Sequence, residues 1–190
     1  MAQLLKQPKT LHKSEGRIDK MTIFAPCKLK MIMATVSLKT IEQNDNVSLF
    51  SICFEDSEES EFEKFMLKFK DNATYNKDYN TIILALAKII DKGALERFFR
   101  IEGKMSDNVA ALSVDSRKLP LYCLRISDQI LILGNGGAKL TRTYEEDMEL
   151  SGYVMDLQKF DKVLIEAQKN GTVTIEKNII TDIQSATFNI

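Results

Sequence analysis

Alternation of apolar and polar positions gives the clearest strand signal in the chain. Phe50, Ile52 and Phe54 alternate with smaller residues, which is the pattern of a strand with one buried face. An earlier apolar run at residues 31–38 predicts another strand. The turn-rich stretch at residues 42–46 follows that run, and we interpret it as the boundary of the compact domain.

Three segments show the period of an amphipathic helix. Ser60 and Glu63 have the spacing of a capping box, and apolar residues then recur every three or four positions. Residues 81–90 are apolar nearly all round and lead to Gly93, which predicts a more buried helix that ends at a glycine. A last helix is predicted over residues 157–167, ending at an Asn-Gly pair.

Between the second and third helices lie three short runs rich in β-branched and aliphatic residues. They cover residues 109–114, 121–126 and 129–133, and the last two are separated only by Ser127-Asp128, which predicts a tight hairpin. The element order is therefore strand, helix hairpin, three-stranded meander and C-terminal helix. This order predicts an α+β fold built on an antiparallel sheet.

Length and charge suggest one domain with two extensions. The chain has 190 residues, 44% of them apolar and 28% charged, which suits one ordinary domain. The net charge is only −1, yet residues 1–40 contain eight basic and two acidic residues. We expect a basic N-terminal extension over residues 1–45, partly disordered or strand-forming. The compact domain is expected over 46–170, and a C-terminal extension over 171–190 has a candidate strand at 172–176.

Several kinds of chemistry are excluded by residue counts. The single histidine, His12, lies in the basic tail, so the domain cannot assemble a His/Cys metal cage or a Ser-His-Asp triad. We expect no metal and no cofactor. Cys27, Cys53 and Cys123 form no C-x-x-C pair and are expected to be reduced, which favours the cytoplasm. No apolar run is long enough to span a membrane.

Two clusters resemble functional motifs but have plainer interpretations. The acidic stretches at residues 55–63 and 145–149 lie beside helix starts, where carboxylates favour the helix dipole. The glycines at residues 134–137 follow a strand but lack the spacing of a phosphate-binding loop. We interpret them as a turn whose glycines supply positive φ.

A basic set on or beside the meander is the more suggestive feature. Taken singly, these are solvated surface charges, but together they would form a basic face that binds RNA phosphates, with aromatic rings that stack on bases. The set consists of Arg97, Arg100, Lys104, Arg117, Lys118, Arg125, Lys139 and Arg142, with Tyr122 and Tyr144 among them.

The same part of the chain resembles a known family. The element order and the segments at residues 95–103, 116–133 and 136–142 are similar to the RelE/ParE superfamily of toxins from toxin-antitoxin systems, closest to its HigB-like branch. The likeness covers about residues 47–168. It implies a RelE-like fold and a ribosome-dependent, metal-independent mRNA endonuclease in the cytoplasm. It also implies neutralisation by a cognate antitoxin, for which a helix-turn-helix domain is one option.

The resemblance also assigns roles to residues. Lys139 and Arg142 match the basic residues after the last strand and would hold the scissile phosphate, and Tyr144 would stand near a base or the reacting hydroxyl. Lys118 or Arg117 would replace the arginine that the family places before its strand tyrosine, because Lys118-Leu119-Pro120 stands ahead of Tyr122 here. The resemblance therefore gives a catalytic set of Lys118, Lys139, Arg142 and Tyr144. The RNA-binding set is Arg97, Arg100, Lys104, Arg117, Tyr122 and Arg125.

Two other functions remain open from the sequence. A protein of the same fold could inhibit a partner such as DNA gyrase, as ParE-like toxins do, without cutting anything. A small interaction domain without enzymatic activity is the third option, which a non-basic meander face would favour.

Overall fold

The computed structural model describes residues 33–102, 107–112, 118–181 and 186–190. The helices are α1 (Glu61–Phe69), α2 (Asn76–Lys92) and α3 (Met148–Lys169), with short 3-10 turns η1 (Glu96–Phe98) and η2 (Tyr144–Glu146). The strands are β1 (Thr35–Gln43), β2 (Ser48–Phe54), β3 (Phe99–Ile101), β4 (Val109–Leu112), β5 (Leu121–Ser127), β6 (Ile130–Gly136), β7 (Ile175–Glu176), β8 (Ile179–Ile180) and β9 (Phe188–Asn189).

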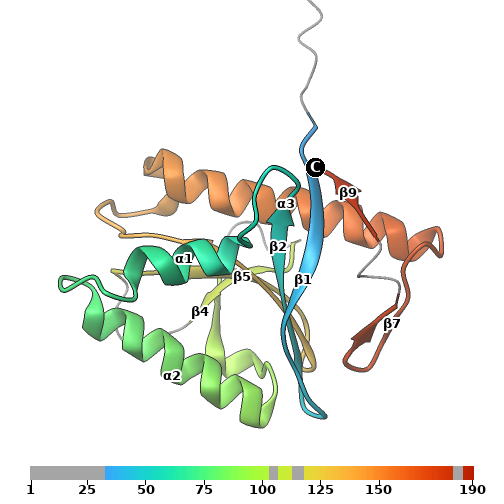
Figure 1. Ribbon diagram of the computed structural model, residues 1–190, viewed down its shortest axis with the longest axis horizontal. Coiled ribbons are helices and arrows are strands. Elements are labelled where there is room, and N and C mark those ends of the chain that lie inside the picture. The colour runs from blue at the N-terminus through green and yellow to red at the C-terminus, as the bar shows by residue number, and fades with distance from the viewer. Residues whose placement is uncertain (1–32, 103–106, 113–117, 182–185) are drawn as a thin grey trace, which may run out of the picture. The chain divides into compact units, whose positions relative to one another are not determined.

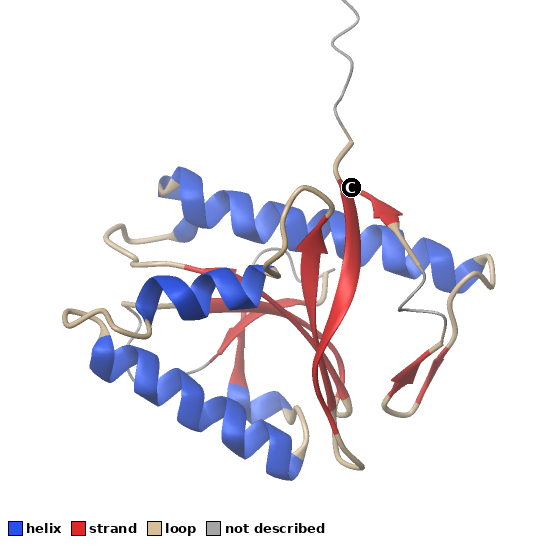
Figure 2. Ribbon diagram, viewed as in Figure 1, coloured by secondary structure: helices blue, strands red, loops and turns tan. Residues whose placement is uncertain are grey.

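Seven strands form one mostly antiparallel sheet in the order β3-β4-β5-β6-β2-β1-β9. The expected α+β architecture, with its helix hairpin, meander and late helix, is confirmed (Figures 1 and 2). One pairing departs from the antiparallel expectation, because β2 runs parallel to β6 from Ser48↔Ile130 to Ser51↔Leu133. Helices α1 and α2 and strands β3 to β5 lie between these two strands in the sequence.

The sheet separates two apolar cores. Helices α1 and α2 cover one face, where Phe65, Phe69 and Ile82 are fully or almost fully buried against Leu49, Leu121 and Leu133. Helix α3 covers the other face and buries Val154, Leu157, Phe160 and Leu164 against Phe50, Ile52, Tyr122 and Ile132. Alternate residues of each strand therefore serve different cores, as the period of two requires.

Local signals fix the ends of the first two helices. Ser60 accepts a hydrogen bond from the Glu63 N–H while the Glu63 carboxylate accepts from the Ser60 N–H, so the predicted capping box is confirmed. Helix α2 begins at Asn76, before the apolar run that signalled it, and Gly93 follows it at φ +86°. Only glycine takes that conformation without strain, which explains why the helix stops there.

Strand β1 belongs to the same sheet as β2, so the fold begins before residue 46. It pairs with β2 from Val36↔Phe54 to Gln43↔Ser48, and its Val36 and Leu38 side chains are buried. The turn-rich stretch closes this hairpin rather than separating domains, because the Asn44 Oδ1 accepts from the N–H groups of Asn46 and Val47. Residues 1–32 of the expected basic extension lie outside the described residues.

The C-terminal segment contributes to the sheet in an unexpected place. The predicted strand at residues 172–176 forms only β7, which pairs with β8 in a separate two-stranded hairpin. Strand β9 instead extends the main sheet by pairing with the start of β1, through Val36↔Phe188. The neighbouring Ala34 and Ile190 exchange backbone hydrogen bonds of 3.0 and 2.8 Å.

The glycines at residues 134–137 were predicted to form a turn with positive φ, and this prediction is wrong. Gly134 and Gly136 lie within β6, and neither has positive φ. A Cβ on Gly136 would lie 2.1 Å from the Pro120 carbonyl oxygen, and one on Gly134 would lie 2.9 Å from Leu157 Cδ1. Gly136 is therefore required by the close approach of the Pro120 backbone, whereas a side chain at Gly134 would displace that of Leu157 on α3.

The described residues bear on two further expectations, the state of the cysteines and membrane-spanning segments. Cys123 is buried and burial raises the pKa of its thiol, whereas Cys53 is half-buried; both are free thiols, and Cys27 lies outside the described residues. Among the described helices, none has the length and apolar character needed to cross a membrane.

Candidate functional site

A short ion pair on β3 is the centre of the candidate site. Arg100 Nε donates to Glu102 Oε1 at 2.6 Å, and the two side chains are 23% and 13% exposed. Arg100 lies on β3 and Glu102 directly after it, where the Glu102 N–H donates to the Val109 carbonyl at 3.2 Å and continues the strand pairing, so both side chains face the same side of the sheet. Because the pair is half-buried, its charges are less screened than those of an exposed pair.

Tyr122 lies on the same face of the sheet as this pair, two strands away from Arg100. Arg100 is paired with Ala111 and Ala111 with Tyr122, and the latter two side chains belong to the α3 core. Tyr122 is fully buried, and its hydroxyl has no hydrogen-bond partner among the described residues. Burial raises the pKa of Tyr122, the Glu102 carboxylate raises it further and the Arg100 guanidinium opposes them. The hydroxyl is therefore protonated at neutral pH.

Tyr144 joins the cluster from η2. Its ring meets that of Tyr122 edge-on, with centroids 6.2 Å apart and planes at 67°. Partial burial raises the pKa of Tyr144, and the charges of Glu145, Glu102 and Asp107 act in the same direction. A half-buried tyrosine that stays protonated can donate a hydrogen bond to an oxygen of a bound ligand.

A β-bulge shapes the sheet beside Tyr122. The β5–β6 register passes from Leu121↔Gly136 to Cys123↔Leu133, so Tyr122 alone faces the two residues Gly134 and Asn135. Such bulges re-aim side chains and are common beside functional sites.

Two of the predicted lysines lie just beyond the ends of β5 and β6. The Lys139 N–H donates to the Lys118 carbonyl at 2.7 Å, and the Gly137 N–H donates to the Pro120 carbonyl at 3.3 Å. These bonds extend the strand pairing past Tyr122, so both lysines stand at the same end of the sheet as Tyr122. The Lys118 side chain is exposed and that of Lys139 is half-buried.

Arg142 lies in the loop that leads from this end to Tyr144. The Glu146 carboxylate accepts hydrogen bonds from the Arg142 N–H and the Thr143 hydroxyl, at 3.4 and 3.2 Å. The loop backbone is thereby fixed while the Arg142 side chain remains exposed. Arg142 has no ion pair with any described residue.

Two predicted RNA-binding residues do not fit their assigned roles. Arg125 Nε donates to the Ala94 carbonyl at 2.8 Å, and its guanidinium pairs with Asp128 in the β5–β6 turn. Ala94 belongs to the α1–α2 core, so Arg125 faces away from Tyr122 and lies about 10 Å further along β5. Tyr122 cannot stack on an exposed base, because its ring is completely buried.

The other predicted residues are peripheral or outside the description. The exposed Arg97 lies with its guanidinium carbon 5.2 Å from the centre of the Phe98 ring. Lys104 and Arg117 lie outside the described residues. The predicted residues that the fold gathers at one end of the sheet are therefore Arg100, Lys118, Tyr122, Lys139, Arg142 and Tyr144.

Sequence reasoning missed the acidic members of the site. Glu102 is the partner of Arg100, and the i, i+2 spacing of the two residues would have pointed to it only if a strand had been predicted at residues 99–101, which it was not. Asp147 caps α3 by accepting from the N–H groups of Glu149 and Leu150, and its charge also acts on Tyr122. The end of the sheet is thus of mixed charge.

The arrangement offers acid-base and electrostatic chemistry on a phosphate-like group. A carboxylate, a guanidinium and a protonated tyrosine lie together, with two lysines and Arg142 at the same sheet end. Within the described residues, no group of three or more His, Cys, Asp and Glu side chains could hold a metal ion.

Comparisons with known proteins add no relative. No protein-family model matches the chain, and no match was found among curated proteins or solved structures.

Proposed function

We propose that this protein is an RNA-cleaving toxin similar to the RelE/ParE superfamily, with a RelE-like fold and a substrate of ribosome-bound mRNA. The observation that carries the proposal is the half-buried Arg100–Glu102 pair above the buried Tyr122 and beside Tyr144. The parallel β2–β6 pairing supports it, because it closes the strand, helix hairpin and meander into the single sheet that presents this cluster.

The residues suit attack of a ribose 2′-hydroxyl on the adjacent phosphate. Glu102 accepts the 2′-hydroxyl proton, the 2′-oxygen forms a bond to phosphorus, and the bond from phosphorus to the 5′-oxygen breaks. The 5′-oxygen takes up a proton as it leaves, from a water held by the Tyr144 hydroxyl. The products are a 2′,3′-cyclic phosphate and a 5′-hydroxyl end.

Cations stabilise the charge that develops on the phosphate oxygens. Arg100 contacts Glu102 through Nε, which leaves its two terminal nitrogens to face a phosphate. Lys139 and Arg142 bind the backbone on either side, with Lys118 in place of the arginine expected before Tyr122. Tyr122 supports the Tyr144 ring from below.

A toxin of this kind requires a partner that silences it. We propose a cognate antitoxin, with a helix-turn-helix domain as one option, that covers the end of the sheet where Tyr144 and Lys139 lie. Its acidic side chains would replace the RNA phosphates.

The test compares induced expression of the wild type with Glu102→Gln and with the Lys139→Ala/Arg142→Ala double variant. Growth is scored and the 5′ ends of ribosome-bound messages are mapped. We expect growth arrest and discrete cleavage from the wild type, about 10²–10⁴-fold less cleavage from Glu102→Gln because it loses the proton acceptor, and a comparable loss from the double variant. Lys162→Ala, an exposed α3 lysine, is the matched control and should cleave like the wild type.

Intact messages with a folded wild-type protein would contradict the proposal. If growth stopped while messages stayed whole and DNA supercoiling failed, the protein would belong to the alternative class that inhibits a partner such as DNA gyrase. Cleavage that persisted in Glu102→Gln would move the proton acceptor to another residue.

A further inference from the structure

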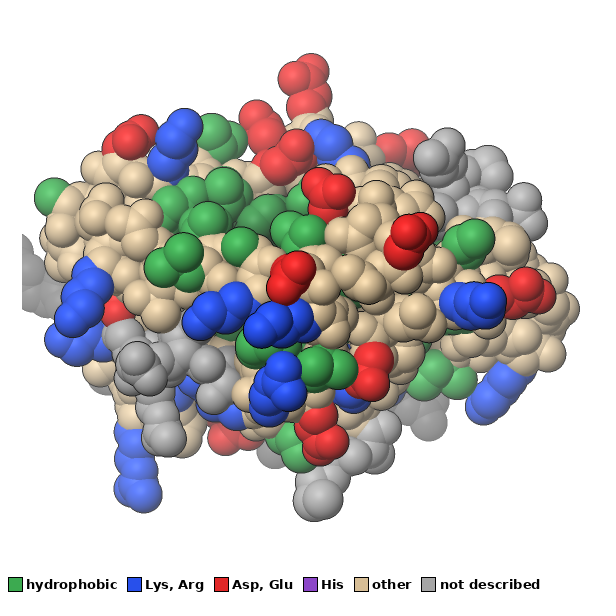
Figure 3. All heavy atoms as spheres, turned by 90° about the horizontal axis from the view of Figure 1, so that it is seen from below, with side chains coloured by type: hydrophobic (Ala, Val, Ile, Leu, Met, Phe, Trp, Pro, Cys, Tyr) green, Lys and Arg blue, Asp and Glu red, His purple; other side chains and the backbone are tan. Residues whose placement is uncertain are grey.

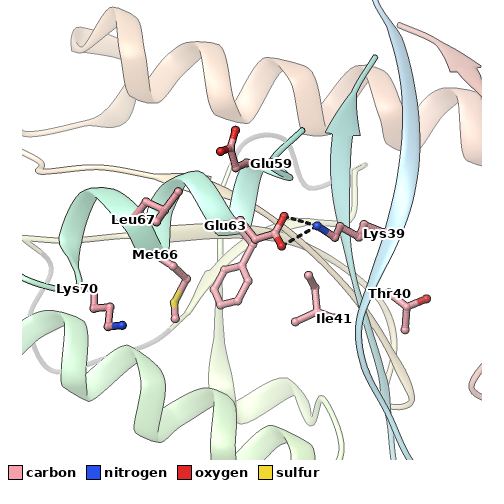
Figure 4. A pocket seen from close by; sticks show the side chains of 9 residues that line it. Lys39, Thr40, Ile41, Glu59, Glu63, Met66, Leu67 and Lys70 are labelled. Atoms are coloured by element: carbon pink, nitrogen blue, oxygen red, sulfur yellow. Dashed lines mark hydrogen bonds and ion pairs between the residues drawn. The ribbon is translucent and has the colours of Figure 1, made fainter. Parts of the chain in front are cut away.

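An open groove lies between β1 and α1, on the opposite face of the sheet from Tyr122. It encloses about 470 Å³ and has an apolar floor formed by Ile41, Phe62 and Met66. Leu67 lines it while remaining 69% exposed. Figure 4 shows Ile41, Met66 and Leu67 around the hollow, together with the Lys39–Glu63 ion pair. This volume is within the range of small binding sites.

The charges that line the groove balance, with Lys39 and Lys70 against Glu59 and Glu63, but the loop beside one end of it is acidic. The loop between β2 and α1 contains four exposed acidic residues, none of which has an ion pair with a described residue: Glu55, Asp56, Glu58 and Glu59. The next carboxylates are already neutralised, Glu61 by Lys64 and Glu63 by Lys39. Glu59 lines the groove itself, whereas Lys70 lies at its other end. The end of the groove beside this loop is therefore acidic.

A second hollow lies on the other side of the acidic loop. It encloses about 380 Å³ and is lined by Phe54 and the start of β1, with Glu55 and Asp56 at its edge. On the face of the molecule seen in Figure 3, apolar side chains are exposed in a group, with acidic and basic side chains around them. Exposed apolar hollows next to charges of one sign are typical of protein-binding surfaces.

We propose that the groove between β1 and α1 binds a basic amphipathic segment of a partner protein. Apolar side chains of that segment enter the hollow over Phe62 and Met66, and its Lys or Arg side chains face residues 55–59. Helices with one apolar face bind grooves in this way, and charge complementarity sets their direction. The inference does not depend on the proposed RNA cleavage, because the two surfaces share no residue.

The test measures binding of a fluorescent 18-residue Leu/Lys peptide with helical amphipathic spacing to the full chain, by anisotropy. The same peptide with Glu in place of Lys is the charge control. We expect the Leu/Lys peptide to bind with an affinity that falls as salt rises, and the Leu/Glu peptide not to bind. Replacing the loop carboxylates, as Glu55→Gln/Asp56→Asn/Glu58→Gln/Glu59→Gln, should weaken binding about tenfold and flatten the salt dependence.

Matched variants separate the groove from the rest of the surface. Leu67→Ser should weaken binding, whereas Leu84→Ser should not, although Leu84 is similarly exposed at 63% on α2. The exposed pair Glu166→Gln/Glu176→Gln is the carboxylate control and should bind like the wild type.

Three results would overturn the proposal. They are no binding of the Leu/Lys peptide, equal weakening by the groove and control variants, or a dimer in light scattering that Leu67→Ser converts to a monomer. In the third case the groove is occupied by a second copy of the chain.

Discussion

The two faces of the sheet treat buried polar groups differently. Beneath α1, the buried Ser51 hydroxyl donates to the Leu133 carbonyl at 2.9 Å and accepts from the Phe62 N–H at 3.0 Å, so its hydrogen bonds join β2, β6 and α1. On the α3 face, the buried Tyr122 hydroxyl has no partner among the described residues and lies near the Arg100–Glu102 pair. The buried hydroxyl of Ser51 on the α1 face therefore finds hydrogen-bond partners within the fold, whereas the buried hydroxyl of Tyr122 on the α3 face finds none among the described residues.

The hydrogen bonds of Ser51 stabilise the fold, whereas the Tyr122 hydroxyl, without a partner in the described part of the chain, costs stability. An unsatisfied buried hydroxyl and a half-buried ion pair both reduce stability relative to apolar residues. Such departures are expected at functional sites. Removing the unpartnered Tyr122 hydroxyl should therefore cost less stability than removing a well-packed group from the α1 face.

The largest effect on stability is expected from the α1 face. Phe65→Ala removes a fully buried ring that lies 5.1 Å from Phe69 and 6.4 Å from Tyr79, between centroids. The free energy of unfolding should fall by about 3–5 kcal/mol because a cavity remains. Urea unfolding followed by circular dichroism measures it. Phe65→Leu should lose clearly less, and equal losses would show that the site collapses around either side chain.

Features that depend on neighbouring residues could be predicted from the sequence, whereas features that depend on distant segments could not. The capping box of Ser60 and Glu63, the Gly93 helix end and the tight β5–β6 hairpin depend on neighbours in sequence. All three are confirmed, although the hairpin turn consists of Asp128 and Gln129, one residue later than predicted. The parallel β2–β6 pairing and the place of β9 depend on segments far apart in the chain. No local pattern specifies them.

The candidate site divides similarly. Arg100 and Tyr144 were predicted, and they contribute to one cluster with Tyr122. The side of the sheet that Arg125 faces depends on strand register, which places it against Ala94 instead. Glu102 was missed because a single carboxylate outside the two acidic stretches is not distinctive until strand β3 places it beside Arg100.

An intermediate effect is expected where α3 is fixed to β4. Asp161 is buried on α3 and accepts from both the Asn108 N–H and the Asn108 side-chain amide, at 3.2 and 2.8 Å. Asp161→Ala should lower the free energy of unfolding by about 1–3 kcal/mol, since two hydrogen bonds from Asn108 to a buried carboxylate are lost. Urea unfolding again provides the measurement. Asp161→Asn keeps one acceptor oxygen and should lose less; an equal loss would mean that the carboxylate charge is what stabilises the contact.

The smallest effect on stability is expected at Tyr122, although this side chain is as deeply buried as Phe65. Tyr122→Phe removes only a hydroxyl that has no partner among the described residues, so the free energy of unfolding should change by less than about 0.5 kcal/mol. If the hydroxyl orders the Arg100–Glu102 pair when RNA binds, the same variant should cleave mRNA more slowly than the wild type while unfolding at the same urea concentration. Unfolding and message cleavage measured on one preparation separate the two effects. A loss of stability above about 1 kcal/mol would instead mean that the hydroxyl is already hydrogen-bonded in the folded protein, for example to a buried water, and that the two faces of the sheet are satisfied alike.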